Sequence, residues 1–461
     1  MRRSIESERR ESAGPQMLVD HTNVGAAFRR LSLPIAYAML GDQLLGIVDT
    51  IVIGSIGTVA LAGVTGAFAV FIAMLFALIG FGSGVSIVAA QRVGAGDLEG
   101  FGRTVRAGFL APAIGSLICI AASLFFAEPL LHVMLGTLPS VHASSHYLIW
   151  RCISLLPMMI SVILISGLGA AGNRRVAIGL LLVINTVHIP LVFVLALGWI
   201  THHPLGVAGA GISSLLAEII GAGYMIAYVL RHPEYRIFSA PQIDVRLAWQ
   251  TARLSFPEVV FLLAVLAPDA FIVTMLAPLG TMTVAGFRAL NIVSDFTFVA
   301  PIPLQEATQT VIGQRLGASD PRGAVDFFRN AIRFSVRFTA LVALAVAFLA
   351  WPLAYVFTLN ATVASLAAIP LALHMLTLPL KGYSMVAMAP LRAAGDTRFS
   401  MFAGLLSSMV ALPMVWTGVR VLHIGLYAVP LAWVSAWAAR AVLTHIRLRT
   451  EDWTRRTLSI R

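Results

Sequence analysis

Residues 91–97 read QRVGAGD, and the same pattern returns as QRLGASD at residues 314–320. The offset between the two stretches is 223 residues, and it also relates two further pairs of segments: RLSLP at 30–34 with RLSFP at 253–257, and AAG at 170–172 with AAG at 393–395. One offset that serves several separated segments indicates an internal duplication. The chain is therefore expected to consist of two copies of one structural unit.

The composition of the chain is that of a membrane protein. Of the 461 residues, 58% are hydrophobic and 11% are charged, against roughly a quarter charged in an ordinary soluble domain. A hydrocarbon core about 30 Å thick needs about 20 apolar residues per helical span, so the length fits about a dozen spans. A single soluble core is excluded, and we predict an all-α polytopic membrane protein.

Hydropathy predicts twelve spans, six in each copy. They lie near 31–56, 61–90, 105–127, 147–170, 176–198 and 206–230, and near 254–279, 283–312, 327–357, 363–391, 398–420 and 424–446. Because each copy has an even number of spans, the two lobes should be related by a pseudo-two-fold axis along the membrane normal. The predicted organisation is a disordered tail at 1–28, an N-lobe at 29–230, a cytoplasmic linker at 231–253, a C-lobe at 254–446 and a basic cytoplasmic tail at 447–461.

The net charge of +11 comes from arginines whose positions predict how the chain is oriented in the membrane. Arginines gather in the two terminal segments and in the connections after even-numbered spans, whereas the opposite connections hold almost no basic residue except Arg420. By the positive-inside rule, both termini are cytoplasmic. The predicted location is a bacterial-type cytoplasmic (inner) membrane, and because the basic excess is accounted for, nucleic acid is not an expected partner.

Three sets of residues carry a family resemblance. The stretch VDTIVIG at 48–54, the duplicated Gln-Arg-x-Gly-Ala-x-Asp pattern and LRAAGDTR at 391–398 resemble the motifs of the multidrug and toxic compound extrusion (MATE) family. The resemblance covers roughly residues 30–445. It implies an efflux antiporter whose two lobes alternate between outward and inward openings, driven by a proton or sodium gradient.

Ionisable residues inside spans are costly in hydrocarbon and therefore indicate functional sites. Asp42 and Asp49 lie seven residues apart, nearly two helical turns, so they share one face of the first span. Burial and like charge both favour a protonated carboxyl group, which is the property that a proton-coupled carrier needs. The resemblance implies that Asp49 is the ion-coupling residue and that Pro34 lets the helix bend. A purely structural hydrogen-bonding role for Asp49 is the alternative.

Three more polar residues lie in the N-lobe spans. Asn185 matches a polar residue that the family places beside the first-span aspartate, but Ile189 stands where many proton-coupled relatives carry a second aspartate. His188 is either a substitute titrating group or a satisfied core histidine. Glu218, in the middle of the sixth span, either lines the cavity or bonds a neighbouring helix.

The C-lobe departs from the sodium-coupled branch of the family. Val265 and Lys381 stand where that branch has a glutamate and an aspartate, so protons are expected rather than sodium. Lys381 is the only lysine in the sequence and lies roughly 16 Å inside the membrane, where it must face a cavity or pair with Asp269 or Asp295. Such a pair would be either structural or part of a switch.

Two transport functions fit these residues. Five acids lie in the spans, against one lysine: Asp42, Asp49, Glu218, Asp269 and Asp295. This acidic excess favours export of amphipathic organic cations in exchange for protons. The alternative, which Lys381 supports, is a dedicated exporter or flippase of one anionic or zwitterionic metabolite or lipid-linked precursor. No nucleophile–base arrangement or metal-ligand cluster is evident, so neither an enzyme nor a metal site is predicted. The expected partners are a small-molecule substrate and the bilayer, the protein should be a monomer, and no cofactor is expected besides the ion gradient.

Overall fold

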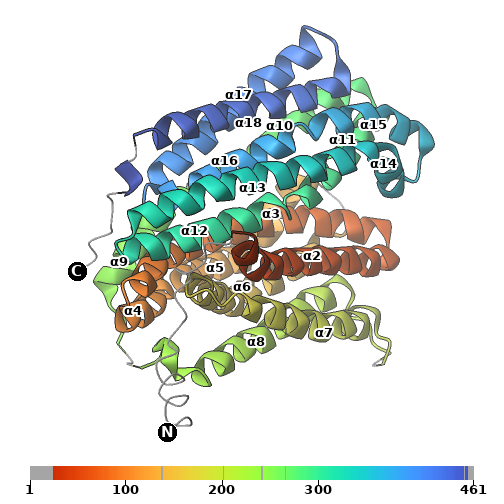
Figure 1. Ribbon diagram of the computed structural model, residues 1–461. Coiled ribbons are helices and arrows are strands. Elements are labelled where there is room, and N and C mark those ends of the chain that lie inside the picture. The colour runs from red at the N-terminus through yellow and green to blue at the C-terminus, as the bar shows by residue number, and fades with distance from the viewer. Residues whose placement is uncertain are drawn as a thin grey trace. The chain divides into compact units, whose positions relative to one another are not determined.

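The computed structural model describes residues 24–136, 139–200, 202–239, 242–264, 266–450 and 452–454, and within these ranges it contains helices and no strand (Figure 1). The helices of the first copy are α2 (Val24–Ile56), α3 (Thr58–Gly94), α4 (Leu98–Gly108), α5 (Leu110–Leu135), α6 (Val141–Ala170), α7 (Arg175–Leu197) and α8 (Gly206–Leu230), followed by the short η2 (Pro233–Tyr235). Those of the second copy are α9 (Val245–Ala264), α10 (Leu266–Leu276), η3 (Ala277–Leu279), α11 (Thr281–Thr297), α12 (Pro301–Gly317), α13 (Pro321–Phe348), α14 (Ala350–Thr358), α15 (Ala361–His374), α16 (Thr377–Ala393), α17 (Thr397–Arg420), η4 (Gly425–Tyr427), α18 (Ala428–Leu448) and η5 (Asp452–Thr454).

The predicted all-helical polytopic class is confirmed. Within the described ranges, 11 helical stretches are long and apolar enough to cross a membrane. The remaining predicted span, 283–312, is divided into α11 and α12 by a turn at residues 298–300, and α12 begins at Pro301. Proline suits the first position of a helix because it has no N–H to donate, which explains where α12 begins.

The chain forms two compact units whose boundaries lie inside helices. Tyr37–Val259 make the N-unit, and described residues 24–36 and 260–454 make the C-unit. Residues 24–28, predicted as part of a disordered tail, are helical, and the predicted linker includes the helical residues 245–253. The reason is tertiary packing, since apolar residues in these stretches, Phe28 and Leu247 among them, are buried.

The first helix of each repeat is fastened by equivalent serines. In the C-unit, Ser32 Oγ donates to the Pro303 carbonyl at 3.1 Å. In the N-unit, Ser255 Oγ lies 3.0 Å from the Phe81 carbonyl and accepts from the Gly84 N–H at 3.1 Å. Ser32 and Ser255 are 223 residues apart, so the duplicated stretches at 30–34 and 253–257 make the same kind of contact twice.

The duplicated Gln-Arg-x-Gly-Ala-x-Asp pattern has a structural explanation. Asp97 pairs with Arg92 and caps α4 by accepting from the Gly100 N–H at 2.8 Å. Asp320 pairs with Arg315 at 2.7 Å and caps α13 in the same way. A carboxylate at a helix N-terminus satisfies a free N–H group and interacts favourably with the helix dipole. The pattern therefore ends one helix and starts the next in both repeats.

The start of the inter-lobe connection is held on the N-unit. The buried Arg106 guanidinium on α4 donates to the carbonyls of Arg236 and Ile237, at 3.1 and 2.7 Å. Asn173 donates to the Tyr235 hydroxyl at 3.0 Å, and burial raises the pKa of Tyr235 above its ordinary value. The segment after η2 is thus fastened to α4.

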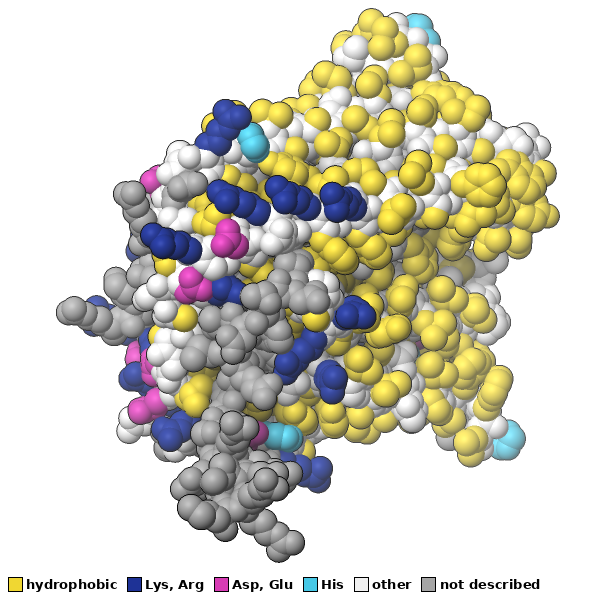
Figure 2. All heavy atoms as spheres, viewed as in Figure 1, with side chains coloured by type: hydrophobic (Ala, Val, Ile, Leu, Met, Phe, Trp, Pro, Cys, Tyr) yellow, Lys and Arg dark blue, Asp and Glu magenta, His cyan; other side chains and the backbone are white. Residues whose placement is uncertain are grey.

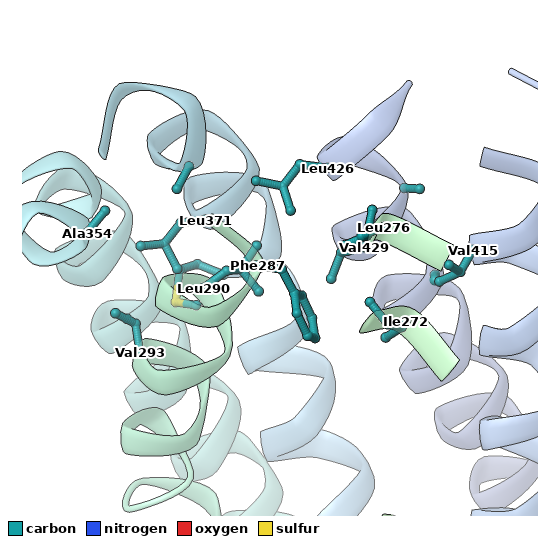
Figure 3. Packing of buried hydrophobic residues seen from close by; sticks show 14 of the residues in the cluster. Ile272, Leu276, Phe287, Leu290, Val293, Ala354, Leu371, Val415, Leu426 and Val429 are labelled. Carbon is teal, nitrogen blue, oxygen red and sulfur yellow. The ribbon is translucent and has the colours of Figure 1, made fainter. Parts of the chain in front are cut away.

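The C-unit has an apolar core in which α10, α11, α15, α17 and α18 meet. Figure 3 shows Phe287 and Leu290 of α11 among Leu371, Val415 and the neighbouring side chains. These side chains are buried, so α10 and α11 pack into the core of the unit. The polar residues on these two helices are therefore held by a packed scaffold.

The outer surface is apolar and polar in separate regions. In Figure 2 the visible Lys and Arg side chains lie in the left and middle parts of the view, and hydrophobic side chains cover most of the right half. Phe125, Val133 and Phe348 are 75%, 85% and 89% exposed. Large apolar side chains exposed in such number fit contact with lipid rather than water.

Candidate functional site

Asp49 and His188 form a contact between α2 and α7 in the N-unit. His188 Nε2 lies 2.7 Å from Asp49 Oδ1, and the two side chains are 1% and 21% exposed. Either the carboxyl or the imidazole can carry the shared proton, because a carboxylic acid donates to a neutral imidazole and an imidazolium donates to a carboxylate. The pair is thus a largely buried place where a proton can be held.

Asn185 does not contact Asp49 in this arrangement. Its side-chain amide donates to the Leu181 carbonyl at 2.9 Å, one turn back in α7. Its Oδ1 is buried and has no partner among the described residues. His188, rather than Asn185, is therefore the α7 side chain that contacts the first-span aspartate.

Arg151, which was not among the predicted site residues, interacts electrostatically with Asp42 and Glu218, the other two acids of the N-unit. Arg151 on α6 lies with its guanidinium 4.1 Å from the centre of the Phe71 ring. It attracts Asp42 and Glu218, and these two acids also repel each other. Asp42 is exposed and Glu218 is buried. The rule that identified the acids, an ionisable residue inside an apolar span, applies to Arg151 equally.

Pro34 lies within α2, which runs from Val24 to Ile56. The proline is two residues before the boundary at which the chain passes from the C-unit to the N-unit. A helix loses one backbone hydrogen bond at an internal proline. The position is compatible with bending there, which stays a prediction.

Lys381 on α16 is 2% exposed and lies in a polar and aromatic environment within the C-unit. Its Nζ donates to Ser294 Oγ on α11 at 3.0 Å, and that hydroxyl lies 3.0 Å from His374 Nε2 on α15. The ammonium lies 4.2 Å from the centre of the Phe298 ring and 5.9 Å from that of Trp437 on α18. A hydroxyl and aromatic rings thus surround this lysine.

Asp269 and Asp295 attract Lys381 electrostatically. Neither carboxylate is within ion-pair distance of Nζ in the described part of the chain. Asp269 on α10 instead accepts from Asn291 at 3.4 Å, and its Oδ1 is buried without a partner among the described side chains. Asp295 on α11 is exposed. The two acids are therefore neighbours of Lys381 rather than its contacts.

The charge balance within the spans needs a correction. Lys381 is not the only cation well inside the predicted spans, because Arg151, Arg288, Arg333, Arg337 and Arg440 also lie there, each within a helix. Arg288 attracts both C-unit acids. The acidic excess is therefore confined to the N-unit, where Asp42, Asp49 and Glu218 outnumber Arg151.

Two points of the sequence analysis concern Val265 and metal ligands. Val265 lies outside the described residues. Among the described ranges, no group of three His, Cys, Asp or Glu side chains is arranged to hold a metal ion.

The comparisons with known proteins agree with the repeat. A family model, MatE, matches residues 34–194 and again residues 257–417, which reproduces the offset of 223 residues. A probable multidrug resistance protein NorM from Rhizobium meliloti is 27% identical over 319 residues, covering 68% of this chain and 67% of the relative. A FAD transporter from Shewanella oneidensis is 25% identical over 347 residues, covering 73% of this chain and 75% of the relative.

Solved structures share the fold. The outward-facing structure of a multidrug resistance MATE family transporter of the MOP superfamily has a TM-score of 0.87 and 19% identity, covering 96% of this chain and 99% of the other. A MOP superfamily transporter from Pyrococcus furiosus has a TM-score of 0.85 and 20% identity, again covering 96% and 99%. At these identities the likeness concerns the fold.

Proposed function

Because this chain belongs to the MatE family of multi-pass membrane transporters, we propose that it is a secondary-active antiporter that exports amphipathic organic cations in exchange for protons. Alternating access of the two lobes would carry the substrate across. The observation that carries the proposal is the contact of 2.7 Å between Asp49 and His188. Asp49 is the proposed coupling residue, and His188 is its partner.

The chemistry of this pair favours a proton over sodium. A hard cation such as sodium prefers several oxygen ligands, whereas Asp49 Oδ1 is already engaged by an imidazole nitrogen. In the C-unit, an ammonium stands where the sodium-coupled branch of the family has a carboxylate. Both observations support proton coupling, with the sodium gradient as the less favoured drive.

The N-unit supports a cationic substrate. Asp42, Asp49 and Glu218 together exceed the charge of Arg151, and Asp42 is exposed. A cation attracted to these acids would compete with the proton for negative charge, which is the condition for exchange. Asn185, with its unpartnered Oδ1, is a further candidate to accept a hydrogen bond from the substrate.

The alternative substrate class, one anionic or zwitterionic metabolite or a lipid-linked precursor, keeps specific support. The FAD transporter of Shewanella oneidensis is among the relatives, and FAD is an anion. Lys381 and Arg288 balance Asp269 and Asp295 in the C-unit, so that unit lacks the acidic excess of the N-unit.

Transport into inverted vesicles, with pH and sodium gradients imposed separately, tests the proposal. We expect a lipophilic quaternary ammonium dye to accumulate under the pH gradient alone and to stop accumulating in Asp49→Asn. Asp326→Asn, a change at an exposed carboxylate on α13, is the matched control and should transport normally. Accumulation of FAD but not of the dye would favour the alternative, and drive by sodium alone would contradict proton coupling.

The proposal also covers the membrane in which the protein lies, its oligomeric state and its orientation. We place the protein in a bacterial-type inner membrane as a monomer with both termini in the cytoplasm. The distribution of arginines along the sequence supports this orientation.

A further inference from the structure

The surroundings of Lys381 have the composition of a cation-binding site. The ammonium has one hydrogen bond, to Ser294 Oγ, and the face of the Phe298 ring at 4.2 Å. Trp437 adds a second ring, and Asp269 and Asp295 supply negative charge at longer range. Aromatic faces combined with nearby carboxylates are the arrangement by which proteins hold alkylammonium groups.

Lys381 is one of two cations that attract the acids near this site. Arg288 and Lys381 both attract Asp269 and Asp295. Arg440 lies close by, but its guanidinium is 5.1 Å from Trp437 and 4.9 Å from Phe261. Removing Lys381 would take one of these positive charges away from the acids and from the aromatic face.

The internal repeat shows that this arrangement is particular to the C-unit. Lys381 corresponds to Met158 in the first copy, and Phe298 corresponds to Leu75. Asp269 corresponds to Gly46, so none of these three features is inherited from the common unit. The lysine, the ring and the acid occur together in one copy and are all absent from the other, as expected for parts of one site.

The N-unit holds its own cation by different residues. Arg151 corresponds to His374, and Phe71, against which Arg151 packs, corresponds to Ser294. The cation over a ring is thus on α6 in one copy and on α16 in the other. Arg151 contacts the ring of Phe71 in the first copy, and Lys381 contacts the ring of Phe298 in the second, so the two copies use residues at non-equivalent positions.

We propose that α10, α11, α16 and α18 form a monovalent-cation box suited to an alkylammonium group, and that Lys381 is its tethered occupant. The box includes Phe298, directly after α11. The C-unit thereby needs no cation from solution to balance its acids. This inference does not depend on the proposed proton exchange at Asp49, because it concerns a site in the other unit and its test does not use transport.

Chemical rescue of the emptied box tests the proposal. Lys381→Ala removes a propylammonium group and leaves Cβ in place. We expect this variant to have a lower thermal midpoint than the wild type, and propylammonium chloride to raise the midpoint again. Wild-type protein should not respond, because its box is filled. Lys381→Met, which fills the volume without a charge, is the matched control and should respond less than Lys381→Ala.

Replacing propylammonium by other added compounds tests what the box recognises. Sodium or potassium chloride at equal ionic strength should stabilise Lys381→Ala less than propylammonium chloride does, because aromatic faces favour an alkylammonium group. Equal rescue by 1-propanol would overturn the proposal, since filling of volume would then be enough. The absence of any response to propylammonium would overturn it too. Phe298→Leu in the Lys381→Ala background should weaken the response to propylammonium.

A second measurement covers the case in which Lys381→Ala does not fold. Because Lys381 is the only lysine, wild-type protein grown with 13C-labelled lysine has one ε-methylene signal in an NMR spectrum. A methylene next to an ammonium 4.2 Å from the Phe298 ring should show an upfield ring-current shift, which Phe298→Leu should remove. An ε-methylene signal at the position of free lysine in both proteins would show that the ammonium does not occupy the box.

Discussion

The contact between Asp49 and His188 should appear as a coupling energy in a double-mutant cycle. Asp49→Ala and His188→Ala each remove one partner, and the double variant removes both. If the two side chains interact as the structure shows, the single changes will not add, because each leaves the other partner buried with an unmet hydrogen bond.

The size of the coupling follows from the geometry. A separation of 2.7 Å lies in the range of charge-assisted hydrogen bonds, which contribute about 1.5–3 kcal/mol. The side chains are 1% and 21% exposed, so the screening that weakens surface pairs has little effect here. We therefore expect a coupling energy of about 2 kcal/mol.

The assay is unfolding of purified variants in mixed micelles by increasing sodium dodecyl sulfate, with the free energy of unfolding compared across the cycle. Glu128 and His142 provide the matched control, because their closest N–O distance is 3.3 Å and their side chains are 46% and 71% exposed. That pair should couple by less than about 0.5 kcal/mol. A coupling of Asp49 and His188 no larger than the control would refute the contact on which the proposed function rests.

Three further predictions follow from the fold. Asp97→Ala and Asp320→Ala should each lower stability by about 1 kcal/mol, since each removes an N-cap in an equivalent position, and a much larger loss in only one repeat would contradict their equivalence. In a cysteine-free background, His142→Cys should react with an impermeant maleimide in intact cells and Glu99→Cys should not, and the opposite pattern would reverse the orientation. Burial raises the pKa of Tyr235, so the neutral phenol stabilises the fold fully below pH 10, the ordinary phenol value. This stabilisation should be lost as the pH rises further. Chemical denaturation across this range should show a smaller loss of unfolding free energy in Tyr235→Phe than in the wild type.

The sequence was sufficient for the parts of the fold that depend on hydropathy and repetition. The constant offset predicted the two copies, and span positions followed from apolar runs. The break between α11 and α12 was missed although Pro301 lies inside the predicted span, because proline alone does not distinguish a bend from a break. The helical state of residues 24–28 and the helical start at Val245 depend on tertiary packing of a few apolar residues, which local composition does not reveal.

The candidate site was only partly predictable, because its contacts join side chains from different helices. Asp49 and His188 were both identified as ionisable residues in spans, but their contact depends on how α2 and α7 face each other. Arg151 satisfied the same rule and was overlooked. The contact of Lys381 with Ser294 was beyond sequence reasoning, because buried serines are common and nothing in the pattern marks the one that meets an ammonium.

The most direct test of the central claim is the release of a proton when substrate binds. Calorimetric titration of the purified protein with a lipophilic quaternary ammonium compound, in buffers of different ionisation enthalpy, measures the number of protons released. Wild-type protein should release protons on binding, Asp49→Asn should bind the compound without this release, and Asp326→Asn should behave as the wild type. Equal proton release by wild-type protein and Asp49→Asn would show that exchange does not run through Asp49 and His188.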